Sequence, residues 1–136
     1  LFRSLLTLNG LLAAEDGIII PVQSEYLALE GLGQLTRTLD RIRGNLFPEL
    51  GIRGVLLTMY DSRTNLSSDV RVEVQKNFPL KVFEVFIPRS IRLAEAPSFG
   101  MPISVYAPKS SGALAYRDLA VELLQGDGIE VDPDEE

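Results

Sequence analysis

The chain has 136 residues, of which 46% are hydrophobic and 24% are charged, and this balance suits a single soluble globular domain. It contains no Cys and no His, which excludes disulfides, thiolate or imidazole zinc sites, Cys nucleophiles and a Ser-His-Asp triad. The net charge is -6, but residues 126–136 hold six acidic residues and no basic one. Residues 1–125 are close to neutral in net charge, so a local basic patch on them can still bind a polyanion.

The sequence shows no membrane or export signal. No apolar run approaches the roughly 18 residues of a membrane helix, and the N-terminus lacks the basic region and the small-residue cleavage site of a signal peptide. We therefore expect a cytoplasmic protein. The chain begins with Leu1 instead of Met, which we interpret as an incomplete end. We expect residues 1–125 to form the folded domain and residues 126–136 to form a disordered acidic tail.

Apolar spacing and turn residues predict alternating helices and strands in the first half of the chain. Residues 4–14 carry apolar side chains at helical spacing and predict a helix, which is followed by a short β-branched strand at 18–22. Leu and Ile recur every three or four positions across 27–46, with arginines between them, which predicts an amphipathic helix. A second apolar run predicts a buried strand at 52–59.

The second half continues this alternation. We predict a helix at 70–78, a third strand at 82–87, a short fourth strand at 103–106 and a last helix at 112–124. Strands that alternate with helices indicate an α/β fold in which helices cover a mostly parallel sheet. Because such folds bind ligands at the carboxyl ends of their strands, the loops after the first three strands are the places to look for a site.

Three segments at those loops carry recognisable motifs. They are PVQSEYLALEGL at 21–32, GVLLTMYDSRTNL at 54–66 and IPRSIRLAEAPSFGMP at 87–102. They resemble the PVQCEYYALEGL, GVLLTMxDxRTNL and IPRNVRLSEAPSxGxP segments of ParA/Soj-type partitioning ATPases of chromosomes and plasmids. The resemblance runs over roughly residues 5–124, so the chain is identified as the C-terminal portion of such a protein. It implies a partial P-loop NTPase (ParA/MinD-like) fold with three layers.

The sequence also departs from that family. Its members hold ATP and Mg²⁺ with a deviant Walker A loop, KGGVGKT, which cradles the phosphates. No Gly-Lys-Thr or Gly-Lys-Ser occurs in this sequence, and the DCPP motif that carries the magnesium-linked Asp is missing. We therefore assign no catalytic and no metal-binding residue. We expect no tightly bound cofactor and no detectable ATP hydrolysis by this chain alone.

The resemblance implies an adenine-side nucleotide contact at four positions. Thr58, Met59 and Asp61 follow the second predicted strand, and Pro88 follows the third. Each has a purely structural alternative, since Met59 can be a core residue and Pro88 can simply end a strand.

It likewise implies sequence-independent DNA binding by Arg63 and Arg92, with Arg89 close by. A planar guanidinium binds phosphate oxygens in a bidentate way, and binding should weaken with salt because counterions are released. The alternative for a loop arginine is a solvated charge or a surface ion pair.

Two classes of function remain open. The first is a fragment of a DNA-segregation ATPase that a ParB-type partner stimulates and that associates with the nucleoid. The second is a stand-alone module that binds non-specific DNA or another partitioning protein, or else a gene remnant without function. An apolar strand at the edge of a partial sheet also predicts self-association through that edge. No basic amphipathic helix ends the chain, which argues against membrane targeting of the MinD kind.

Overall fold

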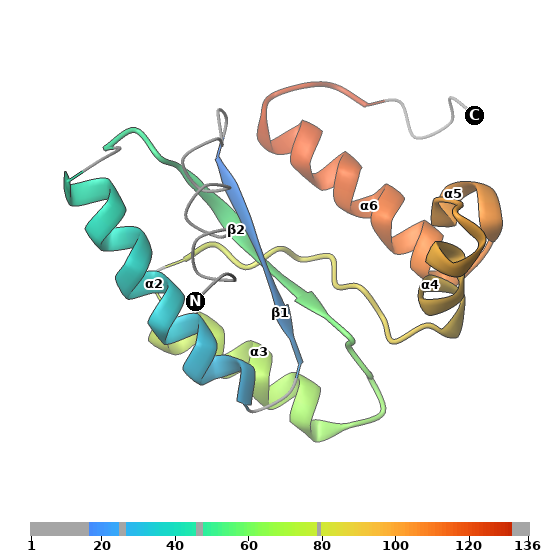
Figure 1. Cartoon of the computed structure of the whole chain (residues 1–136), viewed down its shortest axis with the longest axis horizontal. Coiled ribbons are helices and arrows are strands. Elements are labelled where there is room, and N and C mark those ends of the chain that lie inside the picture. The colour runs from blue at the N-terminus through green and yellow to red at the C-terminus, as the bar shows by residue number, and fades with distance from the viewer. Residues whose placement is uncertain (1–16, 25–26, 46–47, 79, 132–136) are drawn as a thin grey trace.

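The computed structural model describes residues 17–24, 27–45, 48–78 and 80–131 (Figure 1). The helix predicted at 4–14 lies outside these residues. Two parallel strands form the centre of the described part, β1 (Ile18–Gln23) and β2 (Ile52–Thr58). Both strands match the buried β-branched runs in the sequence, so the predictions of strands at 18–22 and 52–59 are confirmed.

Helices α2 (Leu27–Asn45) and α3 (Asn65–Asn77) cover one face of the strands. Alternate residues of a strand point to opposite faces, and on this face β1 and β2 contribute buried side chains to the larger core cluster. Its buried members from the strands and the two helices are Ile20, Val22, Leu32, Leu39, Ile42, Val55, Leu57, Val70 and Val74. The predicted helices at 27–46 and 70–78 are confirmed, although α3 begins five residues earlier than its apolar spacing suggested.

Helix α6 (Ser111–Gly126) covers the opposite face (Figure 1). Its buried residues Ala115 and Leu119 pack with Leu56 of β2 and with Phe83 and Ile87. The helix begins where the side chain of Ser110 accepts a hydrogen bond from the backbone N–H of Ala113, which satisfies one of the free donors of the first turn. The three-layer arrangement and the last predicted helix are therefore confirmed.

The third predicted strand, at 82–87, is wrong as a regular strand. This segment does run parallel to β2, and the N–H groups of Phe83 and Ile87 donate to the carbonyls of Val55 and Leu57 at 3.0 and 2.9 Å. It forms no continuous ladder, however, and its bridges are isolated: Val82 with Val55 of β2, and Pro88 with Tyr60 just after β2. Between these bridges the backbone N–H groups of Glu84 and Val85 donate to a carboxylate of α6 instead of to a strand. The pairing is therefore interrupted where a side chain competes for its donors.

The fourth predicted strand, at 103–106, is a helix. The chain forms α4 (Ile91–Glu95), the 3-10 helix η1 (Ala96–Phe99) and then α5 (Ile103–Tyr106). The carbonyl of Pro102 accepts hydrogen bonds from the N–H groups of Val105 and Tyr106, at 3.0 and 2.9 Å, which closes a turn. The alternating apolar residues of this segment face no sheet, and Val105 is 64% exposed. In the described ranges, no helix combines the length and the apolarity needed to cross a membrane.

Candidate functional site

The carboxyl ends of β1, β2 and segment 81–89 meet at one edge of the fold. The N–H of Ser24, just after β1, donates to the carbonyl of Thr58 at 2.9 Å. The N–H of Tyr60 donates to the carbonyl of Ile87, and the N–H of Arg89 donates back to the carbonyl of Tyr60, both at 3.1 Å. These bonds join the loops in which all the candidate residues were predicted, and we call residues 58–64 and 87–92 the paired loops.

The four residues predicted on the nucleotide side differ in what they do. The hydroxyl of Thr58 donates to the carbonyl of Val22 at 3.3 Å, so it ties the end of β2 to β1. Met59 is 45% exposed and has a positive φ of 53°, which corrects the alternative that it is a core residue. Pro88 bridges to Tyr60 and so continues the pairing of the two segments past the end of β2, which corrects the alternative that it only ends a strand.

Asp61 and Arg63 form a bidentate ion pair. The Nε and Nη2 atoms of Arg63 donate to Oδ1 and Oδ2 of Asp61 at 2.9 and 2.7 Å, and the backbone N–H of Arg63 donates to Oδ1 at 3.0 Å. The side chain of Arg63 is 87% exposed and that of Asp61 is 24% exposed. The carboxylate is thus held inside the loop while the guanidinium lies at the surface.

The start of α3 fixes this turn. The hydroxyl of Thr64 accepts from the N–H of Ser67 at 3.4 Å as the N-cap of the helix and donates to the carbonyl of Asp61 at 2.9 Å. The buried hydroxyl of Ser67 in turn accepts from the N–H of Asp61 at 3.2 Å. The backbone on both sides of Asp61 is therefore anchored to the helix.

The hydrogen bonds from Arg63 control the charge of Asp61. The guanidinium first, and then the backbone N–H of Arg63, lower the pKa of Asp61 from 3.8 to about 2. The positive charges of Arg63 and Arg89 act in the same direction. The same contact raises the pKa of Arg63 above its ordinary value. Both partners are therefore ionised across the physiological range.

Arg92 forms a second ion pair on α4. Its Nη1 donates to Oε2 of Glu95 at 3.0 Å, and the hydroxyl of Tyr106 donates to the same oxygen, also at 3.0 Å. The ring of Tyr106 stacks on that of Phe99 with centroids 5.0 Å apart. These contacts raise the pKa of Arg92, chiefly through the hydrogen bond to Glu95. The surface ion pair that the sequence left open as an alternative is thus present at both Arg63 and Arg92, and the exposed Arg89 lies between them in the chain.

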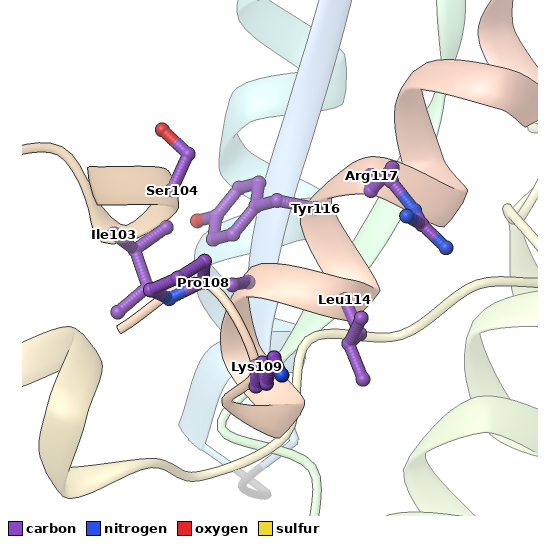
Figure 2. Close-up of a pocket in the computed structure, with 8 residues that line it drawn as sticks. Ile103, Ser104, Pro108, Lys109, Leu114, Tyr116 and Arg117 are labelled. Atoms are coloured by element: carbon purple, nitrogen blue, oxygen red, sulfur yellow. The ribbon is translucent and has the colours of Figure 1, made fainter. Parts of the chain in front are cut away.

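A separate open hollow of about 610 Å³ lies where the α5 turn meets the first turns of α6. Figure 2 shows Tyr116 pointing from α6 toward Ser104 and Pro108, with Lys109 and Leu114 near the first turn of the helix. None of the residues predicted for nucleotide or DNA lines it.

The described residues do not fit a magnesium site. Within ranges 17–24, 27–45, 48–78 and 80–131, no three acidic side chains gather in a way that could hold a metal ion. We therefore derive no step through magnesium from this chain.

Sequence reasoning missed the partners of the arginines. It assigned Asp61 to nucleotide binding and gave no role to Glu95, Tyr106 or Ser67. Ser67 holds the backbone of Asp61, and Glu95 and Tyr106 form the hydrogen bonds around the Arg92 ion pair. A signal for the two carboxylates was present, because Asp61 lies two residues before Arg63 and Glu95 lies three residues after Arg92. The tyrosine comes from another element, and no local spacing points to it.

Comparisons with known proteins support the resemblance that the sequence motifs indicated. Residues 2–52 match a family model described as an AAA domain. The chromosome partitioning protein ParA of Myxococcus xanthus is 52% identical over 123 residues, which is 90% of this chain and 43% of that protein. The sporulation initiation inhibitor protein Soj of Bacillus subtilis is 54% identical over 119 residues, which is 88% of this chain and 47% of that protein.

Solved structures agree with the fold. A crystal structure titled cobyrinic acid a,c-diamide synthase from Mycobacterium smegmatis, with bound ADP and magnesium, matches with a TM-score of 0.71 at 39% identity. The match covers 90% of this chain and 43% of that one. The septum site-determining protein MinD of Pyrococcus horikoshii, at 23% identity and a TM-score of 0.57, supports the fold alone.

The three layers and the parallel strands therefore belong to an α/β protein of the P-loop NTPase type. Within that class, the sequence matches place the chain in the ParA/Soj family, because relatives named ParA and Soj are 52–54% identical to it over about nine tenths of its length. The chain spans about half the length of the curated relatives it matches.

Proposed function

We propose that this chain serves chromosome or plasmid partitioning as part of a ParA-type ATPase, and that its own share is to contact the DNA backbone through Arg63, Arg89 and Arg92. The observation that carries this proposal is the pairing of the two loops. Because the backbone of Tyr60 bonds to both Ile87 and Arg89, the loops that carry arginines of two separate motifs are joined at one edge of the fold.

The chemistry of these arginines suits a phosphate backbone. The side chains of Arg63 and Arg92 are 87% and 60% exposed, so a duplex can reach them without any rearrangement of the core. Their present partners are acidic side chains at the surface, and exposed ion pairs of this kind are weak enough to exchange. Phosphate contacts position a protein without reading bases, which fits sequence-independent binding.

We propose that the same edge faces the adenine of a nucleotide in the intact protein, through Thr58, Met59, Asp61 and Pro88. The exposed Met59 and the surface position of the loops support this, as does the ADP and magnesium in the related mycobacterial structure. ATP and Mg²⁺ are then cofactors of the intact protein, and this chain alone binds neither tightly because its sequence lacks a Gly-Lys-Thr phosphate loop.

The partners follow from the family. We propose that the intact protein meets a ParB-type partner and associates with the nucleoid in the cytoplasm through its DNA contacts. For this chain we propose self-association through its exposed sheet edge. The second candidate is a stand-alone module that binds DNA without nucleotide, and it is favoured by the fact that all three arginines lie within this chain.

The test is a titration of fluorescent, non-specific duplex DNA with the chain at about 50 and about 200 mM salt. It is carried out with and without ATP and magnesium, beside an Arg63→Ala/Arg92→Ala variant. Loss of two phosphate contacts should reduce the slope of log affinity against log salt by about 2. An Arg37→Ala/Arg41→Ala variant is the matched control, because it removes the same charge from the later turns of α2, which run away from the paired loops (Figure 1).

Three results are informative. Salt-sensitive binding that only the Arg63/Arg92 variant loses supports the DNA surface. If that binding is independent of nucleotide, the stand-alone module is favoured over the ATPase fragment. Equal losses in the two double variants would show that only the total charge matters, and the proposed surface would be wrong.

A further inference from the structure

The guanidinium of Arg63 already binds the carboxylate of Asp61 in the same bidentate geometry in which it would bind a phosphate. Its Nε and Nη2 atoms, at 2.9 and 2.7 Å from the two oxygens of Asp61, form the parallel pair of bonds that arginine also offers to phosphate. A phosphodiester that approaches this edge must therefore displace the carboxylate or turn Arg63 away from it.

The two partners of this pair are not equally free to move. Asp61 is held by the backbone N–H of Arg63, and its own backbone is tied to Ser67 and Thr64 at the start of α3. Arg63 has its side chain 87% exposed, so its long stem can swing outward. The carboxylate is thus the fixed partner and the guanidinium is the mobile one.

Arg92 repeats this arrangement on α4. Its Nη1 donates to Glu95, whose oxygen is also held by the hydroxyl of Tyr106 at 3.0 Å. Two of the three arginines proposed to contact DNA therefore carry an acidic partner whose position is fixed by a third group.

We propose that Asp61, and in the same way Glu95, is a built-in competitor for phosphate that holds the affinity of this surface for phosphate-bearing polyanions below that of unpaired arginines. The inference rests on the proposed DNA surface and names its regulation. The competitor stays charged at physiological pH, because the bonds from Arg63 lower the pKa of Asp61 to about 2. The carboxylate therefore lowers the affinity for DNA equally across the physiological pH range and favours fast release of DNA. It does not act as a pH switch.

Asp61→Asn is the deciding variant. Its amide oxygen can still accept from the backbone N–H of Arg63, so the turn is kept while the competing charge is removed. We expect this variant to bind duplex DNA about two- to fivefold more tightly at low salt without nucleotide, in keeping with the modest strength of exposed ion pairs. Asp69→Asn is the matched control, since Asp69 is exposed on α3 and makes none of the contacts described above.

A double-mutant cycle separates the pair from general charge. The gain from Asp61→Asn should disappear in an Arg63→Ala background, because there is then no guanidinium to release. A gain that equals that of Asp69→Asn, or one that persists without Arg63, would overturn the competitor role. Glu95→Gln, tested in the same way against Arg92→Ala, should give a smaller gain, because Arg92 donates one side-chain hydrogen bond to Glu95 whereas Arg63 donates two to Asp61.

A second measurement keeps the inference separate from the proposed function. Inorganic pyrophosphate is titrated against the NMR signal of the Arg63 Nε–H group in the original chain and in Asp61→Asn. The signal should shift at a two- to fivefold lower pyrophosphate concentration in the variant. If no variant binds DNA, the DNA surface is wrong, yet this titration still decides whether Asp61 competes with phosphate. Equal titration curves would show that it does not.

Discussion

At the scale of single residues, Gly54 shows how closely segment 81–89 approaches β2. It lies within β2 at a φ of 156°, and a Cβ there would stand 2.9 Å from the carbonyl oxygen of Lys81 and 2.9 Å from the ring of Phe83. The carbonyl is backbone that accepts the hydrogen bond of Val55, so it cannot simply turn aside. We expect Gly54→Ala to lower the free energy of unfolding by about 1–3 kcal/mol, measured by urea denaturation.

Gly33→Ala is the control for this prediction. Gly33 lies within α2, and a Cβ at this position would meet no atom within 4 Å. The same chemical change should there raise stability by about 0.5–1 kcal/mol, because alanine loses less backbone entropy than glycine in a helix. If Gly54→Ala proved as stable as the original chain, the close approach of segment 81–89 would be wrong.

At the scale of elements, Glu122 links α6 to the segment that ends in the paired loops. Its Oε1 and Oε2 accept from the N–H groups of Glu84 and Val85 at 3.1 and 3.0 Å. Glu122→Gln leaves only one acceptor for two donors and turns an amide N–H toward one of them. We expect a loss of about 1–3 kcal/mol, since bonds to a charged acceptor are the stronger kind.

Hydrogen exchange locates this effect. The amides of Glu84 and Val85 should exchange faster in Glu122→Gln, while those of β2 keep their protection. Asp118→Asn, on an exposed position of the same helix, should change neither. Unchanged exchange at Glu84 and Val85 in the Glu122 variant would refute the link.

The same contact explains why the sequence predicted some elements and not others. The strands at 18–22 and 52–59 are short apolar runs with buried residues at Ile20, Val22 and 54–57, and their local pattern suffices to predict them. The run at 82–87 has a similar apolar pattern, but the N–H groups of Glu84 and Val85 donate to the carboxylate of Glu122. Glu122 lies 37 residues beyond Val85, and no local pattern reveals so distant a partner. The run at 103–106 alternates as a strand does, yet Pro102 starts a turn there.

The candidate site divides in a similar way. The motifs placed Arg63, Arg89 and Pro88 on two loops, and the rule that sites lie at the carboxyl ends of strands predicted that those loops meet. The ion pairs depend on side-chain geometry within each loop. The hydroxyl of Tyr106 arrives from α5, eleven residues beyond Glu95, so its role needed the folded structure.

At the scale of the whole molecule, β1 forms one border of the described sheet. β2 pairs with it on one side, and no segment within the described ranges pairs with its other side. The strand is apolar, and Ile20 and Val22 are buried beneath α2 and α3. An apolar strand edge whose N–H and C=O groups are not paired is a template for pairing with another chain, and the associated fraction then grows as concentration rises.

We therefore expect this chain to associate across the micromolar range, where exposed strand edges promote assembly. Sedimentation velocity over a dilution series should show the mean mass rising with concentration. The β1 amides that face away from β2 should become protected from hydrogen exchange over the same series, because a pairing strand would occupy them. A rise in mass without that protection would place the contact on another surface. A monomer at every concentration, with those amides exchanging freely, would show that the border of β1 does not recruit a second chain.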